Sequence, residues 1–145
     1  MPIYQTSFEV NAPADRVWQV LTTLDRYPDW NPQIPLARGA LERGSQINLR
    51  LALPGRPPLD LAATIEEVRP ASLLTWRGHV VAPWFFEGYR RFEIKPITGS
   101  KVLVTHVEDV HGLLAPLFSV LMGTPVQKSH TALNEALRVR AEGGA

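Results

Sequence analysis

The last third of the chain, residues 112–140, differs in periodicity from everything before it, and this change constrains the fold. Upstream, hydrophobic residues mostly alternate with polar ones, as they do in half-buried strands. In the last third they recur at spacings of three and four, which predicts a long amphipathic helix. A helix with one apolar face needs a surface to cover. We therefore expect the upstream strands to form a sheet on which this helix lies.

The predicted buried stripe of this helix includes two polar residues. Its members share one side of the helix: Val126, Ser129, His130, Leu133, Ala136 and Leu137. The opposite side carries Lys128, Thr131, Glu135 and Arg138. The serine and the histidine predict that the space between helix and sheet is not purely apolar. The segment Gly123-Thr124-Pro125 is expected to end a first piece of the helix or to kink it, because proline removes a backbone donor.

The order of the remaining elements predicts an antiparallel meander. A first strand at residues 3–10 leads into a helix with Asn11 as its N-cap and Pro13 in its first turn. Residues 25–32 should form a turn or second short helix, with Tyr27 and Trp30 buried. Six strands with short connections follow, at residues 34–41, 46–53, 59–68, 73–80, 85–94 and 101–111, the last two joined by a turn at 96–100.

The composition is that of an ordinary globular protein, and it excludes several classes. The 145 residues are expected to form one domain, 1–145, with 45% hydrophobic and 20% charged residues. The absence of cysteine excludes disulfides, thiolate metal sites and a cysteine nucleophile. A net charge of +1 without a basic stripe argues against nucleic acid. No secretory signal or membrane span is recognised, so a cytoplasmic location is expected by default.

Candidate functional side chains lie on the predicted inner face of the last two strands. His106 and Glu108 share a strand face with valines, so both ionisable groups are expected to be buried. Arg90 is a possible partner on the preceding strand. The group could anchor a ligand carbonyl or act as a general acid or base, or it could be a buried pair that only satisfies itself. A single β-bulge would reverse these faces.

Two aromatic residues and a second histidine complete the candidate ligand-binding set. Trp76 and Phe92 could form a wall for a flat ring, although ordinary core packing is the commoner use of such residues. Trp84, after a proline, could lie at the cavity mouth. His130 could meet His106 and Glu108 from the helix. Two histidines and a carboxylate can hold a non-haem metal, but a lone histidine on a helix is more often a core residue, so no metal or cofactor is predicted.

Five short motifs carry a resemblance to a known family. They extend along the whole chain: Asn11-Ala12-Pro13-Ala14-Asp15-Arg16-Val17-Trp18, Tyr27-Pro28-Asp29-Trp30-Asn31-Pro32, Leu74-Thr75-Trp76-Arg77-Gly78, Arg91-Phe92-Glu93-Ile94, and His106-Val107-Glu108-Asp109 leading to Gly112. The chain resembles the polyketide cyclase/dehydrase-like proteins of the START and pollen-allergen (SRPBCC) superfamily. The resemblance implies an α+β helix-grip fold, in which a curved antiparallel sheet of about seven strands wraps around a long C-terminal helix, with two short helices after the first strand.

The resemblance implies a cavity for an apolar molecule but leaves the function open. The first hypothesis is binding of a lipid, polyketide, aromatic or isoprenoid compound by Trp76, Arg90, Phe92, His106, Glu108 and His130. The second is a polyketide cyclase or aromatase in which His106 or Glu108 moves protons. The third is an interaction protein that docks on a chaperone or forms a homodimer; the oligomeric state, monomer or homodimer, stays open.

The state of the cavity separates these hypotheses. A cavity filled by side chains would favour the interaction protein. An open cavity with His106 and Glu108 unpaired would favour catalysis. An open cavity in which they are paired would favour carriage of a ligand.

Overall fold

The computed structural model describes residues 3–52 and 55–143. In chain order its elements are β1 (Ile3–Val10), α1 (Ala14–Thr22), the 3-10 turn η1 (Leu24–Arg26), α2 (Tyr27–Trp30), β2 (Leu36–Arg38), β3 (Gln46–Leu51), β4 (Leu59–Arg69), β5 (Leu73–Val80), β6 (Phe86–Thr98), β7 (Lys101–His111) and α3 (Ala115–Gly143). The expected order of one strand, short helices, six strands and a long helix is confirmed.

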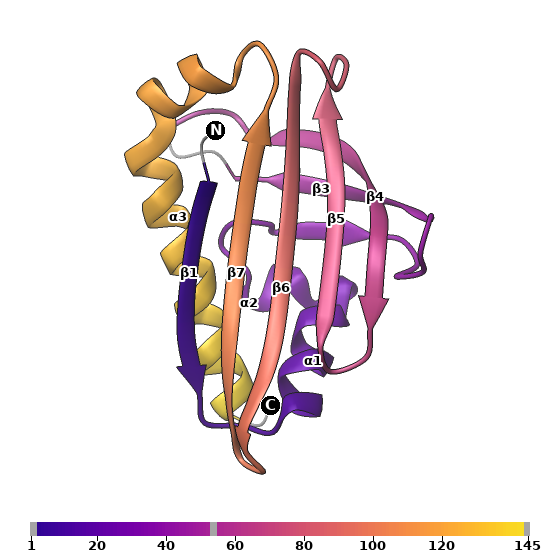
Figure 1. The fold of residues 1–145 in the computed structure, drawn as a ribbon, viewed down its shortest axis with the longest axis vertical. Coiled ribbons are helices and arrows are strands. Elements are labelled where there is room, and N and C mark those ends of the chain that lie inside the picture. Colours follow the sequence, from indigo (N-terminus) through magenta and orange to yellow (C-terminus); the bar gives the residue numbers. More distant parts are fainter. Residues whose placement is uncertain (1–2, 53–54, 144–145) are drawn as a thin grey trace.

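The strands form one antiparallel sheet in the order β1-β7-β6-β5-β4-β3-β2. Consecutive strands from β2 to β7 pair with their neighbours, and β1 closes the other edge by pairing with β7. Figure 1 shows that the sheet curls, so that β3 crosses behind the long strands instead of lying in their plane. Strong twist of this kind is normal for a large antiparallel sheet. The curl gives the sheet a concave face.

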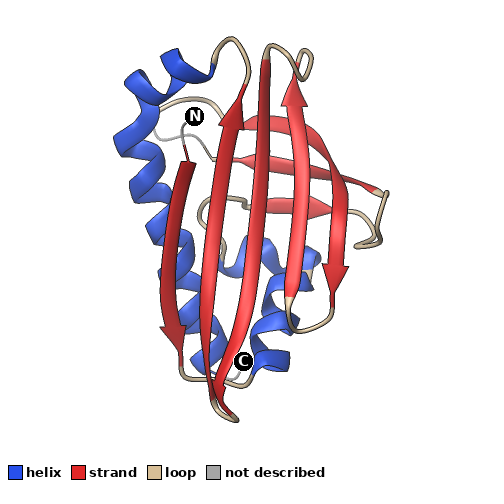
Figure 2. Cartoon of the chain, in the orientation of Figure 1, coloured by secondary structure: helices blue, strands red, loops and turns tan. Residues whose placement is uncertain are grey.

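The helices lie together on the concave face of the sheet. Figure 2 shows α3 running along the β1 edge and the short helices closing the lower end. Arg16 of α1 donates hydrogen bonds to the carbonyl oxygens of Arg140 and Ala141 at the end of α3, at 3.1 and 3.4 Å. Since the last carbonyls of a helix have no partner within it, these bonds both satisfy them and join α1 to α3. The architecture is the expected helix-grip fold. Among the described residues, no helix is long and apolar enough to span a membrane.

The hydrophobic core fills the lower part of the space between sheet and helices. Inward positions of every strand contribute to it, together with Val17 and Leu21 of α1 and Leu133 and Leu137 of α3. These side chains are completely or almost completely buried. The inner faces predicted for the last two strands are confirmed, because a strand with period two keeps every second residue on one side of the sheet.

Several predicted strand boundaries were wrong. The strand expected at 34–41 is only Leu36–Arg38, and β6 continues past Pro96 to Thr98 with an irregular register there. Leu53, the expected end of β3, lies outside the described residues. The shortened β2 has a local cause: the Asn31 Oδ1 atom accepts hydrogen bonds from the backbone N–H groups of Gln33 and Ile34, at 3.0 and 2.8 Å. Such an Asx turn competes with strand pairing.

The helix ends also differ from the prediction. Pro13, not Asn11, is the N-cap of α1, and no side chain caps this helix. Of the two outcomes expected at Pro125, a helix end or a kink, the structure shows the kink, because α3 is continuous from Ala115 to Gly143 with the proline inside it. Figure 1 shows the first turns of α3 running at an angle to the rest, as expected of a helix that lacks one backbone donor. Trp30 is only half-buried, whereas Tyr27 is buried as predicted.

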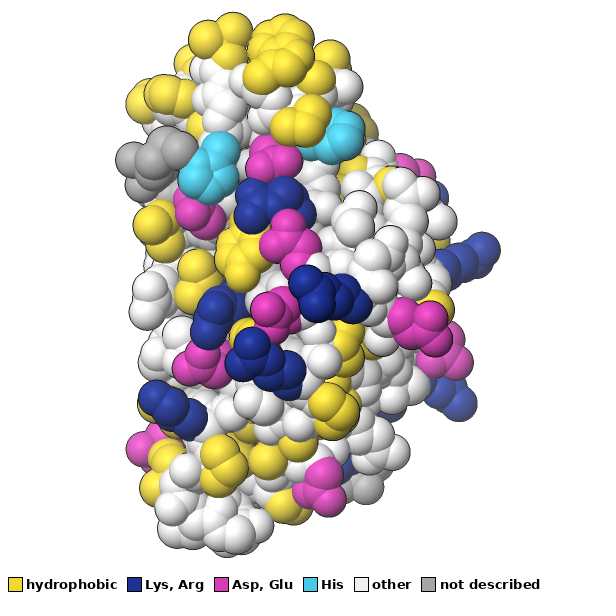
Figure 3. Space-filling model, turned by 45° about the vertical axis from the view of Figure 1, so that its right-hand side comes forward, with side chains coloured by type: hydrophobic (Ala, Val, Ile, Leu, Met, Phe, Trp, Pro, Cys, Tyr) yellow, Lys and Arg dark blue, Asp and Glu magenta, His cyan; other side chains and the backbone are white. Residues whose placement is uncertain are grey.

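The outer face of the sheet is covered by ion pairs. Figure 3 shows basic and acidic side chains interspersed over it. Arg77 contacts both Glu66 and Glu87, with N–O distances of 2.7 and 2.8 Å, and Arg91 contacts Glu93 at 2.5 Å. Charged side chains on this face leave the concave face as the apolar side of the sheet.

Candidate functional site

A pair of glycines leaves the inner face of the sheet without side chains at one level. Gly78 of β5 and Gly88 of β6 lie directly opposite each other in the ladder. A Cβ atom built on Gly88 would meet no heavy atom within 4 Å, whereas one on Gly78 would lie 2.7 Å from the Leu61 side chain. Glycine in the middle of a strand removes packing. At Gly88 the missing side chain leaves a space between the sheet and α3, whereas at Gly78 it lets the Leu61 side chain pack closely.

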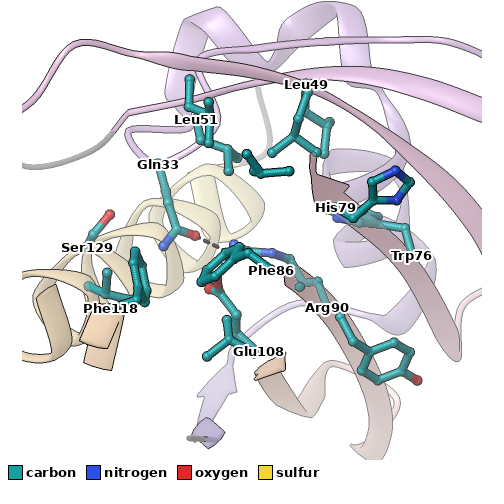
Figure 4. Close-up of a pocket in the computed structure, with 18 of the residues that line it drawn as sticks. Gln33, Leu49, Leu51, Trp76, His79, Phe86, Arg90, Glu108, Phe118 and Ser129 are labelled. Atoms are coloured by element: carbon teal, nitrogen blue, oxygen red, sulfur yellow. Dashed lines mark hydrogen bonds and ion pairs between the residues drawn. The ribbon is translucent and has the colours of Figure 1, made fainter. Parts of the chain in front are cut away.

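This space is a cavity of about 240 Å³ with mostly apolar walls. Figure 4 shows Leu49 and Leu51 of β3 on one side and Phe86 with Glu108 on the other, with Phe118 and Ser129 of α3 nearby. Its further apolar lining comes from Leu59, Leu61, Val80, Val110, Leu114 and Val126. A concave apolar space with a few polar groups is the usual form of a small-molecule site.

The ladder positions explain which of the predicted residues reach the cavity. Trp76, Arg90 and Glu108 are cross-strand neighbours on the level below the two glycines, and all three line the cavity. Phe92 and His106 form the next level down and are buried in the core instead. His130 is also fully buried behind the wall. The candidate set therefore divides into three lining residues and three residues of a layer beneath them.

Aromatic stacking holds the layer beneath the wall together. The Phe92 and His106 rings stack with centroids 4.3 Å apart, and the His106 and His130 rings stack at 3.6 Å. The Trp76 ring also packs against Phe92, with the ring centroids 5.9 Å apart. The series connects β5, β6, β7 and α3, so it fixes the helix against the sheet immediately below the cavity.

Arg90 is the centre of a hydrogen-bonded polar cluster at the bottom of the cavity. We call Arg90 with Gln33, His106, Glu108 and Asn134 the Arg90 cluster. The Arg90 Nη1 atom lies 2.6 Å from Gln33 Oε1 and 2.9 Å from His106 Nε2, and Nη2 lies 2.9 Å from Glu108 Oε2. The Arg90 side chain is 6% exposed and that of Glu108 is 17% exposed. A buried charge needs such a partner, so the pair neutralises both groups.

The hydrogen bonds fix the protonation state of His106. Arginine only donates, so His106 Nε2 accepts from Arg90 and the ring proton is on Nδ1. That Nδ1 donates to Asn134 Oδ1 at 2.8 Å, and Asn134 Nδ2 donates to Thr6 Oγ1 at 2.6 Å. Burial, followed by the positive charge of Arg90 and the nearby His130, holds the pKa of His106 well below its usual value. His106 is therefore neutral and serves to position Arg90.

Glu108 remains ionised because its charged neighbours outweigh the effect of burial on its pKa. Burial alone would raise the pKa of its carboxyl, but the Arg90 guanidinium and the His130 ring together lower it below its usual value. His130 Nε2 faces the His106 carbonyl oxygen at 3.2 Å and so donates to it, while Nδ1 lies 3.8 Å from Glu108 Oε2 without a hydrogen-bond partner among the described residues. Among the residues that line the cavity, Arg90 and Glu108 thus form an oppositely charged pair.

The two histidines and Glu108 do not form a metal site. Both ring nitrogens of His106 already bond to protein atoms, Arg90 on one side and Asn134 on the other. Within residues 3–52 and 55–143, no group of three or more His, Cys, Asp or Glu has a metal-binding arrangement.

Three contributions to the site did not emerge from the sequence. Gln33 lies in a loop, where periodicity says nothing about direction, and its carbonyl oxygen binds Arg90. Asn134 is buried beside Leu133, so the buried stripe of α3 is wider than predicted, while Ala136 is only half-buried. Gly78 and Gly88 could have been noticed as glycines inside two successive strand patterns, which often mark close approach or space.

Exposed apolar side chains gather at the end of the molecule near the cavity. They come from the β5–β6 loop and the start of α3: Val81, Trp84, Leu113, Leu117, Val120 and Leu121. Figure 3 shows hydrophobic side chains concentrated at this end. Backbone bonds from Leu113 and Leu114 to the carbonyls of Trp84 and Phe85, at 3.0 and 2.9 Å, join the two segments. Trp84 itself is largely exposed rather than part of the cavity lining.

Solved structures of similar fold include aromatases and START proteins. A START superfamily protein from Mycobacterium smegmatis has a TM-score of 0.75 and 21% identity, with 99% of each chain covered. The ZhuI aromatase/cyclase from Streptomyces sp. R1128 has a TM-score of 0.64 and 18% identity, covering 95% of this chain and 94% of that one. The di-domain aromatase/cyclase BexL has a TM-score of 0.72 and 16% identity over 96% of this chain, which spans only 47% of the BexL chain. At these identities the likeness establishes the fold.

No curated protein matches the sequence significantly. The sequence model of one family, described as polyketide cyclase / dehydrase and lipid transport, matches residues 1–142. The match covers nearly the whole chain and agrees with the motifs and with the helix-grip architecture. The chain therefore belongs to the polyketide cyclase/dehydrase and lipid transport family.

Proposed function

We propose that this protein binds and carries a hydrophobic small molecule in the cavity between sheet and helix. One observation carries the proposal: the cavity is open, yet the ionisable groups at its bottom are already paired with each other. Apolar walls favour a ligand such as a lipid or an aromatic or isoprenoid compound through removal of its surface from water. The family description, which includes lipid transport, supports a ligand of this kind.

The pairing of the ionisable groups favours carriage over cyclase chemistry. A general acid or base works best with a pKa near the operating pH. The pKa values of Glu108 and His106 are both lowered, so neither holds a proton to give at neutral pH. His106 also lies beneath the wall. An open cavity likewise favours ligand binding over a role only in contacts with other proteins.

Gly88 provides a direct test of the proposal. The position faces the cavity and has no heavy atom within 4 Å of its potential Cβ, so Gly88→Val should place a side chain in the empty space. We expect the affinity for the uncharged fluorescent probe N-phenyl-1-naphthylamine to fall at least tenfold. The free energy of unfolding should stay the same or rise by about 0.5 kcal/mol, because glycine in a strand interior costs roughly that amount.

Gly99→Val is the matched control. Gly99 lies in the β6–β7 turn, and a Cβ there also meets no heavy atom within 4 Å, but the position is not part of the cavity. Probe affinity should be unchanged in this variant. Equal affinities of the unaltered protein and Gly88→Val would place the probe elsewhere and refute binding in the cavity. If Gly88→Val loses affinity for the probe, native mass spectrometry of the protein from its own host would identify the natural compound.

A further inference from the structure

The cavity wall carries one cation and one anion that are paired with each other. Among the lining residues, Arg90 and Glu108 are the oppositely charged pair, and the other titratable ones are His79, which is exposed, and Tyr89. The Arg90–Glu108 contact is 2.9 Å with both side chains mostly buried. His106 beneath them is neutral because its Nε2 accepts from Arg90. A ligand that reaches this point meets a compensated pair rather than a free cation.

A charged head group would disturb this balance. A carboxylate placed beside Arg90 would also lie beside the Glu108 carboxylate, and it would arrive without its hydration shell. An ammonium group would likewise be repelled by the Arg90 guanidinium. An uncharged head group causes neither repulsion nor an uncompensated buried charge.

Gln33 determines which uncharged group fits. Its Oε1 atom is occupied by Arg90 Nη1 at 2.6 Å, so the amide nitrogen must turn away from Arg90. Figure 4 shows this nitrogen directed toward the side of the cavity where Phe118 and Ser129 lie. The amide NH₂ can only donate, and the Ser129 hydroxyl can donate as well. Both groups suit an oxygen that accepts hydrogen bonds.

We propose that the cavity selects an uncharged apolar ligand bearing a hydrogen-bond-accepting oxygen, such as a ketone or ester carbonyl, and rejects the corresponding carboxylate. This rests on the proposed function, since it assigns the ligand class of the same cavity. Gln33 and Ser129 are the donors to that oxygen. The Arg90–Glu108 pair is the element that excludes charge.

A series of ligands with one chain length and different head groups tests the inference. Displacement of N-phenyl-1-naphthylamine at pH 7.5 would be measured for 2-undecanone, undecane, undecylamine and undecanoic acid, whose carboxyl is ionised at this pH. We expect 2-undecanone to bind at least tenfold more tightly than undecanoic acid and undecylamine, and several-fold more tightly than undecane. Gln33→Leu should reduce the advantage of the ketone over undecane.

Glu108→Gln provides the decisive variant. It leaves the Arg90 charge uncompensated, so the ratio of ketone to carboxylate affinity should shift at least tenfold toward the carboxylate. Glu87→Gln is the control, because Glu87 pairs with Arg77 on the outer face of the sheet, and it should leave the ratio unchanged. If Glu108→Gln does not fold, the ratio in the unaltered protein decides the question by itself.

The outcomes distinguish this inference from the proposed function. A carboxylate that binds as tightly as the ketone, or a ratio unmoved by Glu108→Gln, would overturn the head-group assignment while probe binding upheld the cavity as a ligand site. A protein that binds neither probe nor any member of the series would overturn the proposed function, and the inference with it.

Discussion

At the scale of single residues, His106 is the side chain on which the polar cluster depends. It is fully buried, and its two ring nitrogens join Arg90 of β6 to Asn134 of α3. Its ring also stacks between Phe92 and His130. Protonation would place a positive charge next to Arg90 and remove the acceptor that Arg90 uses. The folded protein therefore resists protonation of this ring.

The consequence is a loss of stability in mild acid. Because the folded pKa of His106 lies well below the usual 6.5, the unfolded chain takes up a proton first as the pH falls. Between pH 7.5 and 5.5 the free energy of unfolding should fall by roughly 1.4 kcal/mol from this residue alone. Urea denaturation at the two pH values measures it. Glu108, whose folded pKa is also lowered, adds a loss only at pH values below its usual 4.5.

Two histidine variants isolate the effect. His106→Gln should remove this part of the pH dependence, although it lowers stability at both pH values because bonds in the cluster are lost. His79→Gln, at an exposed position, should keep the full dependence. An identical slope in His106→Gln and the unaltered protein would assign the acid sensitivity to another group.

At the scale of elements, α3 continues through a proline that helices usually avoid. Pro125 lacks the N–H that would bond to the carbonyl of Leu121, and its ring crowds that carbonyl. Leu121 is exposed, so water can satisfy the carbonyl. The part before the proline contributes Phe118 to the cavity wall, and the part after it contributes Val126 and Ser129.

Replacing the proline should therefore stabilise the helix. Pro125→Ala should raise the free energy of unfolding by about 1 to 3 kcal/mol, since proline in a helix interior costs up to about 3 kcal/mol relative to alanine. Thermal or urea unfolding measures the change. Pro116→Ala is the matched control: Pro116 lies in the first turn of α3, where proline is tolerated, and should have little effect. A loss of stability in Pro125→Ala would mean that the packing of α3 requires the bend.

At the scale of the whole molecule, the cavity lies between the two layers of the fold, the sheet and the long helix. Its walls come from five strands and from α3, so a bound ligand would contact both layers. A ligand that binds only the folded state at a free concentration 100 times its Kd stabilises the protein by about 2.7 kcal/mol. For a chain of this size that corresponds to a rise in Tm of roughly 5 to 10 °C.

Thermal unfolding with and without 2-undecanone checks this expectation. The unaltered protein should show the rise, and Gly88→Val should unfold at the same temperature in both conditions. A ligand that is displaced competitively by the probe but leaves Tm unchanged would indicate binding to the unfolded chain as well.

The sequence predicted the fold and the direction of the site residues, because both depend on local periodicity. His106, Glu108 and Arg90 face inward as expected, since the register of β6 and β7 is regular around them. The register shifts lie elsewhere, in β4 between Ile65 and Glu67 and at the far end of β6 between Pro96 and Thr98. Alternation within a strand is sufficient for this level of detail.

The depth of each inward residue could not be read from the sequence. Phe92 and His106 point the same way as Arg90 and Glu108, yet α3 covers the former pair through His130 and leaves the latter at the cavity. That difference depends on where the helix crosses the sheet, which is a tertiary property. The roles of Gln33 and Asn134 follow from the same packing, so only coordinates reveal them.

Two neighbouring rows of residues across β5, β6 and β7 control the size and the polarity of the cavity separately. Gly88 determines how much room there is, and Trp76, Arg90 and Glu108, one level away, determine its polarity. Substitutions at the first level change which molecular shapes fit, without altering the electrostatic character of the chamber. A library varied at Gly88 alone would therefore yield receptors that differ in the bulk of the guest they admit while preferring the same kind of functional group.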